Sequence, residues 1–143
     1  MRLTSLNRRG TKAADFSFVD RKGRRYTLYG INAERTILFF SNPGCKACKE
    51  IIEALNASED VSSHIADGSL AVLNIYIDED LTEWYNYMPI YPDSWYNGYD
   101  HNHVIRDEEL YDVRAIPSLY LLDKDKNVIF KDVTTEKLLN NLP

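Results

Sequence analysis

The chain has two cysteines, Cys45 and Cys48, and they stand where an apolar run gives way to a helical pattern. Residues 36–40 end in Ile-Leu-Phe-Phe, which is typical of a buried strand, and the Ser-Asn-Pro-Gly that follows is typical of a break between elements. From Cys45 onward, apolar residues recur at the spacing of a helix face. The sequence therefore predicts a strand, a tight loop and a helix with Cys45 in its first turn.

The position of the two cysteines predicts redox chemistry. Backbone N–H groups are unpaired in the first turn of a helix, and the helix dipole stabilises a thiolate there, so a cysteine pKa can fall from about 8.5 to about 3.5–7.5. Cys45 is thus predicted to be the nucleophile. Cys48 lies about one turn later on the same face, close enough to attack a mixed disulfide on Cys45 and release the partner. Lys46 adds a cation between the two thiols.

Two other uses of a CxxC pair have to be weighed. The pair could supply half of a four-ligand zinc site, or the two thiols could be buried and inert. A zinc site needs two further ligands, but the sequence has no other cysteine, and the histidines His64, His101 and His103 do not lie at the spacing of zinc ligands. Redox chemistry remains the favoured interpretation, and we predict no metal site and no cofactor.

Length and charge limit the classes of protein to which the chain can belong. Its 143 residues suit a single domain, residues 1–143, in which residues 1–13 are expected to form a poorly ordered N-terminal segment. The 17 basic and 22 acidic residues give a net charge of -5, which disfavours nucleic acid as a partner. No stretch approaches the roughly 18 apolar residues of a membrane span, and residues 1–12 lack the apolar core of a signal peptide.

The rest of the sequence alternates between strand and helix patterns. Residues 16–28 alternate apolar and polar residues around a charged turn with Gly23 at its tip, as in a β-hairpin. After the cysteine helix, which should end near Ala57, a second helix is expected over residues 61–66 and a buried strand over residues 70–77. A strand, helix, strand crossover of this kind places its two strands parallel and side by side.

The C-terminal part predicts a hairpin and a closing helix. Residues 118–122 and 128–131 are strand-like runs on either side of a charged turn, and residues 135–142 have the pattern of a helix. Together with the parallel strand pair, this antiparallel hairpin gives an α/β fold with a mixed sheet flanked by helices.

Residues 84–103 have the most unusual composition in the chain. The segment contains eight large side chains: Trp84, Tyr85, Tyr87, Met88, Tyr91, Trp95, Tyr96 and Tyr99. Pro89, Pro92 and Gly98 indicate loops rather than one long helix. We expect most of the rings to cover a small core of the segment's own. Exposed rings could form a partner surface, because Tyr and Trp are enriched at interfaces.

Two separate motifs resemble thioredoxin-fold proteins and, among them, the TlpA-like thiol:disulfide oxidoreductases. Residues 36–52 are similar to that family's strand, CxxC and first helix, and residues 14–28 are similar to its opening hairpin. Residues 111–128, which begin Tyr-Asp-Val-Arg-Ala-Ile-Pro-Ser, are similar to its cis-proline strand and following hairpin. The resemblance implies a thioredoxin-like mixed sheet with an N-terminal β-hairpin and an aromatic-rich insertion before the cis-proline strand.

The resemblance also implies a substrate groove beside the cysteines. It implies a cis bond between Ile116 and Pro117, with Pro117 packed beside Cys45 as a third catalytic residue. The backbone of Ile116 would then be free to pair with an extended substrate chain. Substrate contacts are further expected from four residues around the cysteines: Pro43, Gly44, Lys46 and Ala47.

The chain departs from the family pattern at two points. Many relatives have Trp-Cys-x-Pro-Cys, whereas here Gly44 precedes the first cysteine and Lys-Ala separates the pair, so a redox potential cannot be transferred from relatives. Phe39 stands where thioredoxin itself has a buried aspartate that assists proton transfer. A general acid or base must therefore come from elsewhere, with water or Glu50 as candidates.

The favoured function is that of a thiol:disulfide oxidoreductase. It acts on protein disulfides through the CxxC dithiol, as a reductant rather than an oxidant, and an upstream redox donor restores the dithiol. The alternative is a redox-inactive binding module that uses the aromatic insertion and the Pro117 groove. By resemblance, a periplasmic or cell-envelope location is expected, with a cytoplasmic one left open, and the oligomeric state is not predicted.

Overall fold

A computed structural model describes residues 10–102, 105, 111, 116–131 and 133–142 of the chain. Its strands are β1 (Ser17–Asp20), β2 (Arg25–Thr27), β3 (Arg35–Phe40), β4 (Leu70–Tyr76), β5 (Tyr96–Tyr99), β6 (Ser118–Leu122) and β7 (Val128–Lys131). Its helices are α2 (Lys46–Ala57), α3 (Glu59–Asp67), α4 (Leu81–Tyr87), the 3₁₀ helix η1 (Met88–Ile90) and α6 (Thr135–Leu139).

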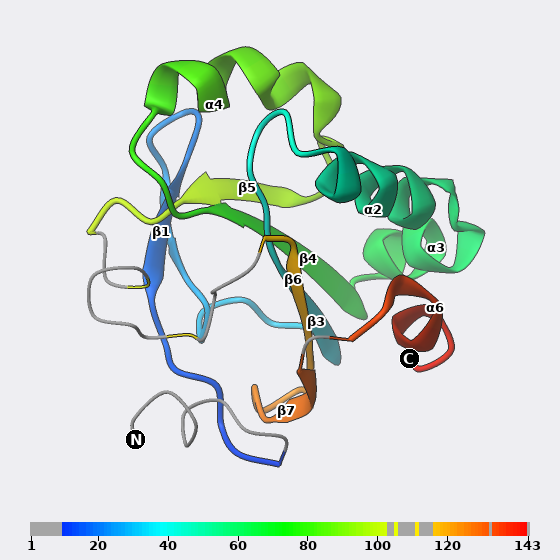
Figure 1. Cartoon of the computed structure of the whole chain (residues 1–143). Coiled ribbons are helices and arrows are strands. Elements are labelled where there is room, and N and C mark those ends of the chain that lie inside the picture. Colours follow the sequence, from blue (N-terminus) through cyan, green and yellow to red (C-terminus); the bar gives the residue numbers. More distant parts are fainter. Residues whose placement is uncertain (1–9, 103–104, 106–110, 112–115, 132, 143) are drawn as a thin grey trace.

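The seven strands form one sheet in the order β2-β1-β5-β4-β3-β6-β7 (Figure 1). Strands β3, β4 and β5 run parallel in its middle, and antiparallel strands join them on both sides. The parallel pairing of β3 with β4 across α2 and α3 confirms the predicted crossover. The predicted mixed sheet flanked by helices is therefore confirmed.

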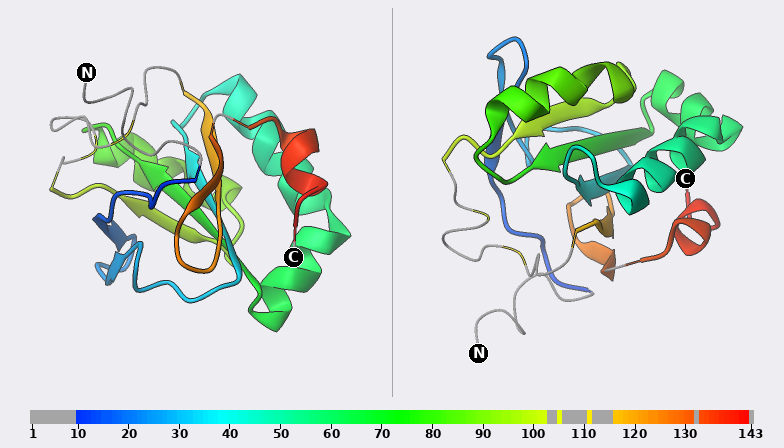
Figure 2. Two further views of the ribbon diagram at one scale, coloured as in Figure 1. Left: turned by 90° about the horizontal axis from the view of Figure 1, so that it is seen from below. Right: turned by 45° about the horizontal axis from the view of Figure 1, so that its top comes forward.

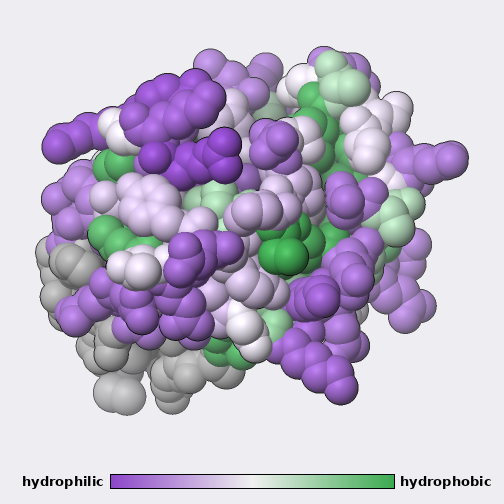
Figure 3. All heavy atoms as spheres, turned by 90° about the horizontal axis from the view of Figure 1, so that it is seen from above, coloured by the Kyte–Doolittle hydropathy of each residue, from purple (hydrophilic) through white to green (hydrophobic). Residues whose placement is uncertain are grey.

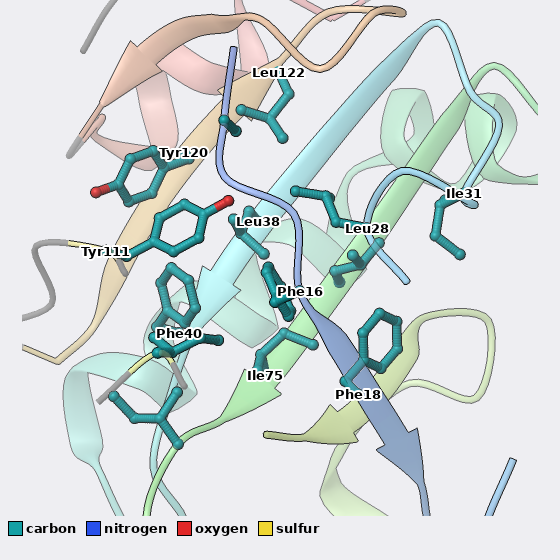
Figure 4. Close-up of a cluster of buried hydrophobic side chains, with 14 of the residues drawn as sticks. Phe16, Phe18, Leu28, Ile31, Leu38, Phe40, Ile75, Tyr111, Tyr120 and Leu122 are labelled. Carbon is teal, nitrogen blue, oxygen red and sulfur yellow. The ribbon is translucent and has the colours of Figure 1, made fainter. Parts of the chain in front are cut away.

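Side chains of the central strands alternate between two buried clusters, one on each face of the sheet. In β3, Leu38 and Phe40 belong to the first cluster, whereas Ile37 and Phe39 belong to the second. Burial on both faces explains why this strand is continuously apolar. The first cluster, drawn in Figure 4, joins rings from distant segments: Phe16, Phe18, Phe40, Tyr111 and Tyr120.

Helices α2, α3, α4 and α6 all contribute to the second cluster. Their buried residues there include Ile52, Leu55, Val61, Trp84 and Leu138. Helices α2, α3 and α6 lie side by side on one face of the sheet (Figure 2). The first cluster is covered instead by the chain around β1 and β2, from which Ala13, Leu28 and Ile31 are buried.

The predicted elements are confirmed with small changes at their ends. Both strands of the C-terminal hairpin, β6 and β7, have the predicted bounds. Helix α3 begins earlier than predicted, at Glu59, because the hydroxyl of Ser58 accepts a hydrogen bond from the N–H of Val61 at 3.3 Å and caps the helix. Helix α6 is shorter than predicted and ends at Leu139, before two asparagines, which are poor helix formers.

The aromatic segment joins the main core, which corrects the expectation of a small core of its own. Trp84, Tyr91 and Trp95 are buried in the second cluster together with residues of β3 and β4. The segment also supplies β5, which pairs with β4 on one side and with β1 on the other. The buried rings of the segment therefore pack against the central strands β3 and β4. His103 lies outside the described residues.

Residues 10–13 of the N-terminal segment are hydrogen-bonded to the β6–β7 hairpin. Ala13 is fully buried, and its N–H donates a hydrogen bond to the carbonyl of Lys126 at 2.8 Å. The N–H of Gly10 donates to the carbonyl of Val128 at 2.7 Å. Backbone pairing of this kind leaves little trace in side-chain patterns. Residues 1–9 lie outside the described residues.

Candidate functional site

Cys45 is the N-cap residue of α2, one position before the first turn in which it was predicted. Its backbone is extended, and its Sγ accepts a hydrogen bond from the N–H of Cys48 at 3.2 Å. The carbonyl of Cys45 accepts the first intrahelical bond, from the N–H of Lys49 at 3.0 Å. The sulfur therefore occupies the position where a cap satisfies an unpaired N–H group and where the helix dipole favours negative charge.

Cys45 and Cys48 form a disulfide, with their Cα atoms 5.2 Å apart. The two sulfurs differ in access to solvent, because Cys48 is 1% exposed and belongs to the second cluster, whereas Cys45 is half-buried. An incoming thiol or disulfide can reach Cys45 more easily than Cys48. This asymmetry suits a pair in which Cys45 forms a mixed disulfide with a partner and Cys48 then attacks it to form the Cys45–Cys48 disulfide.

The loop between β3 and α2 presents the disulfide at one end of the sheet (Figure 1). Ser41 continues the strand by one backbone bond, from its N–H to the carbonyl of Ile75 at 3.2 Å. The N–H of Cys45 then donates to the carbonyl of Asn42 at 3.3 Å, which closes a turn. Gly44 has a φ of +75°, a conformation that other residues adopt only with strain. The glycine is thus required by the turn that carries Cys45.

A buried polar network lies under this loop. The hydroxyl of Ser41 donates a hydrogen bond to Oδ1 of Asn74 in β4. The Nδ2 group of Asn74 donates to Oδ1 of Asn97 in β5 at 3.0 Å, and Asn97 donates to the carbonyl of Pro92 at 2.9 Å. Sequence reasoning missed all of these residues. The polar Asn74 within the otherwise apolar β4 was the available signal, because a buried amide has to be hydrogen-bonded.

Pro117 lies at the same end of the sheet as the cysteine loop. Ser118 pairs with Phe40, so Pro117 and Ser41 both stand beside the last bonded pair of β3 and β6. The peptide bond between Ile116 and Pro117 is cis. Ile116 is half-buried and packs against both buried clusters. Cys45 packs against the second of these clusters. The structure therefore places Ile116, Pro117 and the cysteine loop at the same end of the sheet.

The other residues expected at the site differ in exposure. Pro43 is half-buried, whereas Gly44, Lys46 and Ala47 are exposed around the disulfide. Phe39 is fully buried. Glu50 and Glu53 are exposed on α2, and the residues between Tyr111 and Ile116 lie outside the described part of the chain.

Acidic side chains lie on one side of the cysteine loop. Asp78 and Asp80 lie in the turn after β4, and Glu83 lies in the first turn of α4. Burial raises the pKa of the Tyr76 hydroxyl, and the negative charges of these three carboxylates raise it further, against a hydrogen bond with the Asp80 backbone that lowers it. Because β3 and β4 are parallel neighbours, this turn and the cysteine loop leave the sheet at the same end.

The histidines and the remaining acidic groups do not gather into a further site in the described part of the chain. No group of three or more His, Cys, Asp or Glu residues among the described positions is placed to hold a metal ion. His64 instead shares a hydrogen bond with Ser69 at 3.0 Å. No helix formed by the described residues has both the length and the apolar character needed to cross a membrane.

Comparisons with known proteins agree with this fold. The family model described as thioredoxin-like matches residues 33–128, which include both cysteines and Pro117. A thioredoxin-like protein from Bacteroides caccae is 43% identical with a TM-score of 0.95, over 97% of this chain and 50% of that one. The C-terminal domain of an uncharacterized protein from Bacteroides fragilis is 48% identical with a TM-score of 0.91, over 95% of this chain and 97% of that one.

A more distant similarity is to a domain of a possible thiol-disulfide isomerase from Cytophaga hutchinsonii, which is 25% identical with a TM-score of 0.77, over 95% of this chain and 91% of that one. No curated protein matches the chain. The chain thus spans about half of the Bacteroides caccae protein and nearly all of the Bacteroides fragilis domain. With the family match, the mixed seven-stranded sheet and the CxxC pair at a helix start, the chain belongs to the thioredoxin-like family and has a TlpA-like thioredoxin fold.

Proposed function

We propose that the chain is a thiol:disulfide oxidoreductase that acts on disulfides of other proteins. One observation carries the proposal: Cys45 and Cys48 form a disulfide at the start of α2, with Cys45 half-buried and Cys48 buried. The start of a helix stabilises a Cys45 thiolate. In disulfide exchange this thiolate is the nucleophile in one direction and the leaving group in the other. The arrangement therefore suits reversible transfer of two electrons.

The reaction is written as two exchanges. The Cys45 thiolate attacks one sulfur of a substrate disulfide, forms a mixed disulfide and releases the other substrate sulfur as a thiolate. The Cys48 thiolate then attacks the Cys45 sulfur, forms the Cys45–Cys48 disulfide and releases the second substrate thiolate. The substrate gains two electrons and the protein loses two. An upstream thiol donor returns the protein to the dithiol by the reverse exchanges.

The substrate groove is proposed to run beside Cys45. Pro117 would act there as the third catalytic residue, and the backbone of Ile116 would pair with an extended substrate strand. Support comes from the register of β3 and β6, which places Pro117 at the end of the sheet that carries the cysteine loop. Further substrate contacts are proposed for four residues around the disulfide: Pro43, Gly44, Lys46 and Ala47.

The TlpA-like resemblance supports a proposal for the direction, partners and location of the reaction. We propose that the chain acts as one domain and as a reductant, that it receives electrons from an upstream redox donor, and that it works in the bacterial cell envelope. No cofactor is proposed.

The alternative of a redox-inactive binding module has less support. It needs a surface built from the aromatic segment, but Trp84, Tyr91 and Trp95 are buried. Tyr85 and Ile90 are the exposed large apolar residues of this segment, each 45% exposed. Isolated exposed side chains of this kind are ordinary on protein surfaces.

The proposal is tested by equilibrating the protein with a graded thiol buffer and counting labelled thiols by mass. A reversible two-electron transition is expected. A midpoint near or below about −250 mV supports the reductant, and one above about −150 mV supports an oxidant instead. The Cys48→Ser variant should trap mixed disulfides on Cys45, and the Cys45→Ser variant is the matched control that should trap none. The proposal fails if no reversible transition occurs.

A further inference from the structure

The space beside Cys45 at Gly44 has a carboxylate as its nearest neighbour. A Cβ atom placed on Gly44 would have one heavy atom within 4 Å outside the adjacent residues, Oε1 of Glu83 at 3.8 Å. Gly44 itself is exposed. Where many relatives have a tryptophan before the first cysteine, this chain has an open position with an acidic oxygen at its edge.

The backbone of Glu83 is positioned by the N-terminal cap of α4, and its side chain is exposed. Glu83 lies in the first turn of α4, where its N–H donates a hydrogen bond to Oδ1 of the N-cap Asp80 at 3.0 Å. The contact distance and standard backbone geometry place the Oε1 atom of Glu83 within about 9 Å of the Cα of Cys45. Within the described part of the chain, the Glu83 carboxylate forms no ion pair.

We propose that Glu83 determines substrate specificity by favouring disulfides that carry a positive charge next to the sulfur attacked by Cys45. The inference rests on the proposed oxidoreductase function and names the substrate class for the same site. In the mixed disulfide, the substrate residues next to the sulfur must pass the surface around Cys45, and Gly44 leaves room there for a side chain. An ammonium or guanidinium group in this space meets a carboxylate, whereas an anionic group meets a like charge.

The surroundings of the site favour a charge-based selection. Asp80 is the N-cap residue of α4, in whose first turn Glu83 lies, and Asp78 lies two residues earlier in the same turn, so both add charge of the same sign. Figure 3 shows the end of the molecule toward which the cysteine loop points as mostly hydrophilic, with hydrophobic residues in small separate patches. Lys46 is the charge of opposite sign next to Cys45, and it is exposed. A charged substrate group near Cys45 is therefore affected by the negative charge of Glu83 and by the positive charge of Lys46.

The effect is tested with three small disulfides that differ in charge. The reduced protein is mixed with cystamine, which has an ammonium group on each half, with 2-hydroxyethyl disulfide, which is neutral, and with dithiodiglycolate, which has a carboxylate on each half. The rate of formation of the Cys45–Cys48 disulfide is measured at low ionic strength. The measured quantity is the ratio of the cystamine rate to the dithiodiglycolate rate, and the rate with the neutral disulfide is recorded separately.

The Glu83→Gln variant is expected to lower this ratio about three- to tenfold, because the lost charge lies within about 9 Å of the Cα of Cys45 and acts with opposite sign on the two charged probes. Its effect on the Cys45 thiolate is common to all three probes and cancels in the ratio. Added salt at about 0.5 M should remove most of the difference between variant and wild type. The Lys46→Gln variant should change the ratio in the opposite direction.

The control variant is Glu59→Gln, which makes the same change in net charge at the start of α3. The 12-residue helix α2, which is about 18 Å long, separates Glu59 from Cys45. It should leave the ratio unchanged. The inference is overturned if Glu83→Gln leaves the ratio unchanged while the neutral probe still oxidises the protein, or if Glu59→Gln lowers the ratio equally. If none of the three disulfides oxidises the wild type, the proposed function itself has failed.

Discussion

The hydroxyl of Ser41 donates a hydrogen bond to the side-chain carbonyl of Asn74, and both residues are almost completely buried. Ser41 is the first residue after β3, and Asn74 lies within the central strand β4. Asn74 also donates to Asn97 in β5. This network joins the loop that carries the redox pair to the strand supplied by the aromatic segment. The position of Cys45 therefore depends on contacts far away in the sequence.

Replacing Asn74 with alanine should lower the free energy of unfolding by about 2 kcal/mol or more. The change leaves the Ser41 hydroxyl and the Asn97 carbonyl without partners in a buried region, where each unsatisfied group costs about 1–3 kcal/mol. Urea denaturation of Asn74→Ala, Ser41→Ala and the double variant measures the coupling, expected at about 1 kcal/mol. Additivity of the two single changes within about 0.3 kcal/mol would show that the pair does not interact.

Tyr91 should make stability depend on pH in the alkaline range. Burial raises the pKa of Tyr91 to about 12, against an opposing effect of the nearby Ser41 and Asn74. The unfolded chain loses the phenolic proton near pH 10, so this contribution is fully present below about pH 10 and is lost as the pH rises toward 12. Tyr91→Phe should therefore make the decline of stability above pH 10 shallower, by up to about 1.4 kcal/mol per pH unit.

At neutral pH the same Tyr91→Phe change should alter the free energy of unfolding by less than about 1 kcal/mol. The variant keeps the aromatic ring, and the buried Tyr91 hydroxyl has no hydrogen-bond partner in suitable geometry within the described part of the chain. Urea denaturation at pH 7 and at several values above 10 tests both statements. Tyr85→Phe is the control, because that ring is 45% exposed, and an equal effect of the two variants would contradict the prediction.

Asp20 should stabilise the N-terminal hairpin above acidic pH. Burial alone would raise the pKa of Asp20, but hydrogen bonds from Arg24 and from the N–H of Lys22, together with the Arg24 charge, outweigh it and lower the pKa. A lowered pKa in the folded state gives stability that is present above the unfolded pKa of about 3.9 and is lost as the pH falls through the folded value.

The Asp20→Asn variant should accordingly lower the free energy of unfolding by about 1 kcal/mol at pH 7, because it loses the charge-assisted bond to Arg24 at 2.7 Å. The difference from wild type should shrink when urea denaturation is repeated near pH 3. Asp93→Asn, at an exposed position, is the control. A difference that grows on acidification would contradict the assigned direction of the pKa shift.

Gly98 should tolerate no side chain, because β1 packs directly against it. A Cβ atom at this position of β5 would lie 2.5 Å from Cδ2 of Phe18 and 3.0 Å from the carbonyl oxygen of Val19. Gly98→Ala should lower the free energy of unfolding by about 1–3 kcal/mol through overpacking, measured by urea denaturation. Gly68→Ala provides the comparison, because that position has open space and strains only the backbone at φ +85°. An unperturbed Gly98→Ala variant would mean that β1 and β5 separate easily.

The candidate site was predictable where its signals are local. The Ser-Asn-Pro-Gly break, the CxxC spacing and the helical pattern after it lie within one short stretch, and the structure places the pair at the start of α2 as expected. Glu83 was not predictable, because it approaches Gly44 only through the parallel pairing of β3 and β4. Local patterns carry no information on which distant turn lies beside a loop.

The amino-acid sequence by itself determined most of the elements of this protein and the place of the CxxC pair at the start of a helix. Alternating and continuous apolar runs specify strands through their burial, so both strands of the C-terminal hairpin have the predicted bounds. Only the tertiary structure decided that β5 enters the sheet between β1 and β4, that Ala13 is buried, and that Asn74 supports the redox loop. Those outcomes depend on which buried surfaces and polar groups find partners across the whole chain, and such long-range pairing is settled by the packed core rather than by any local pattern.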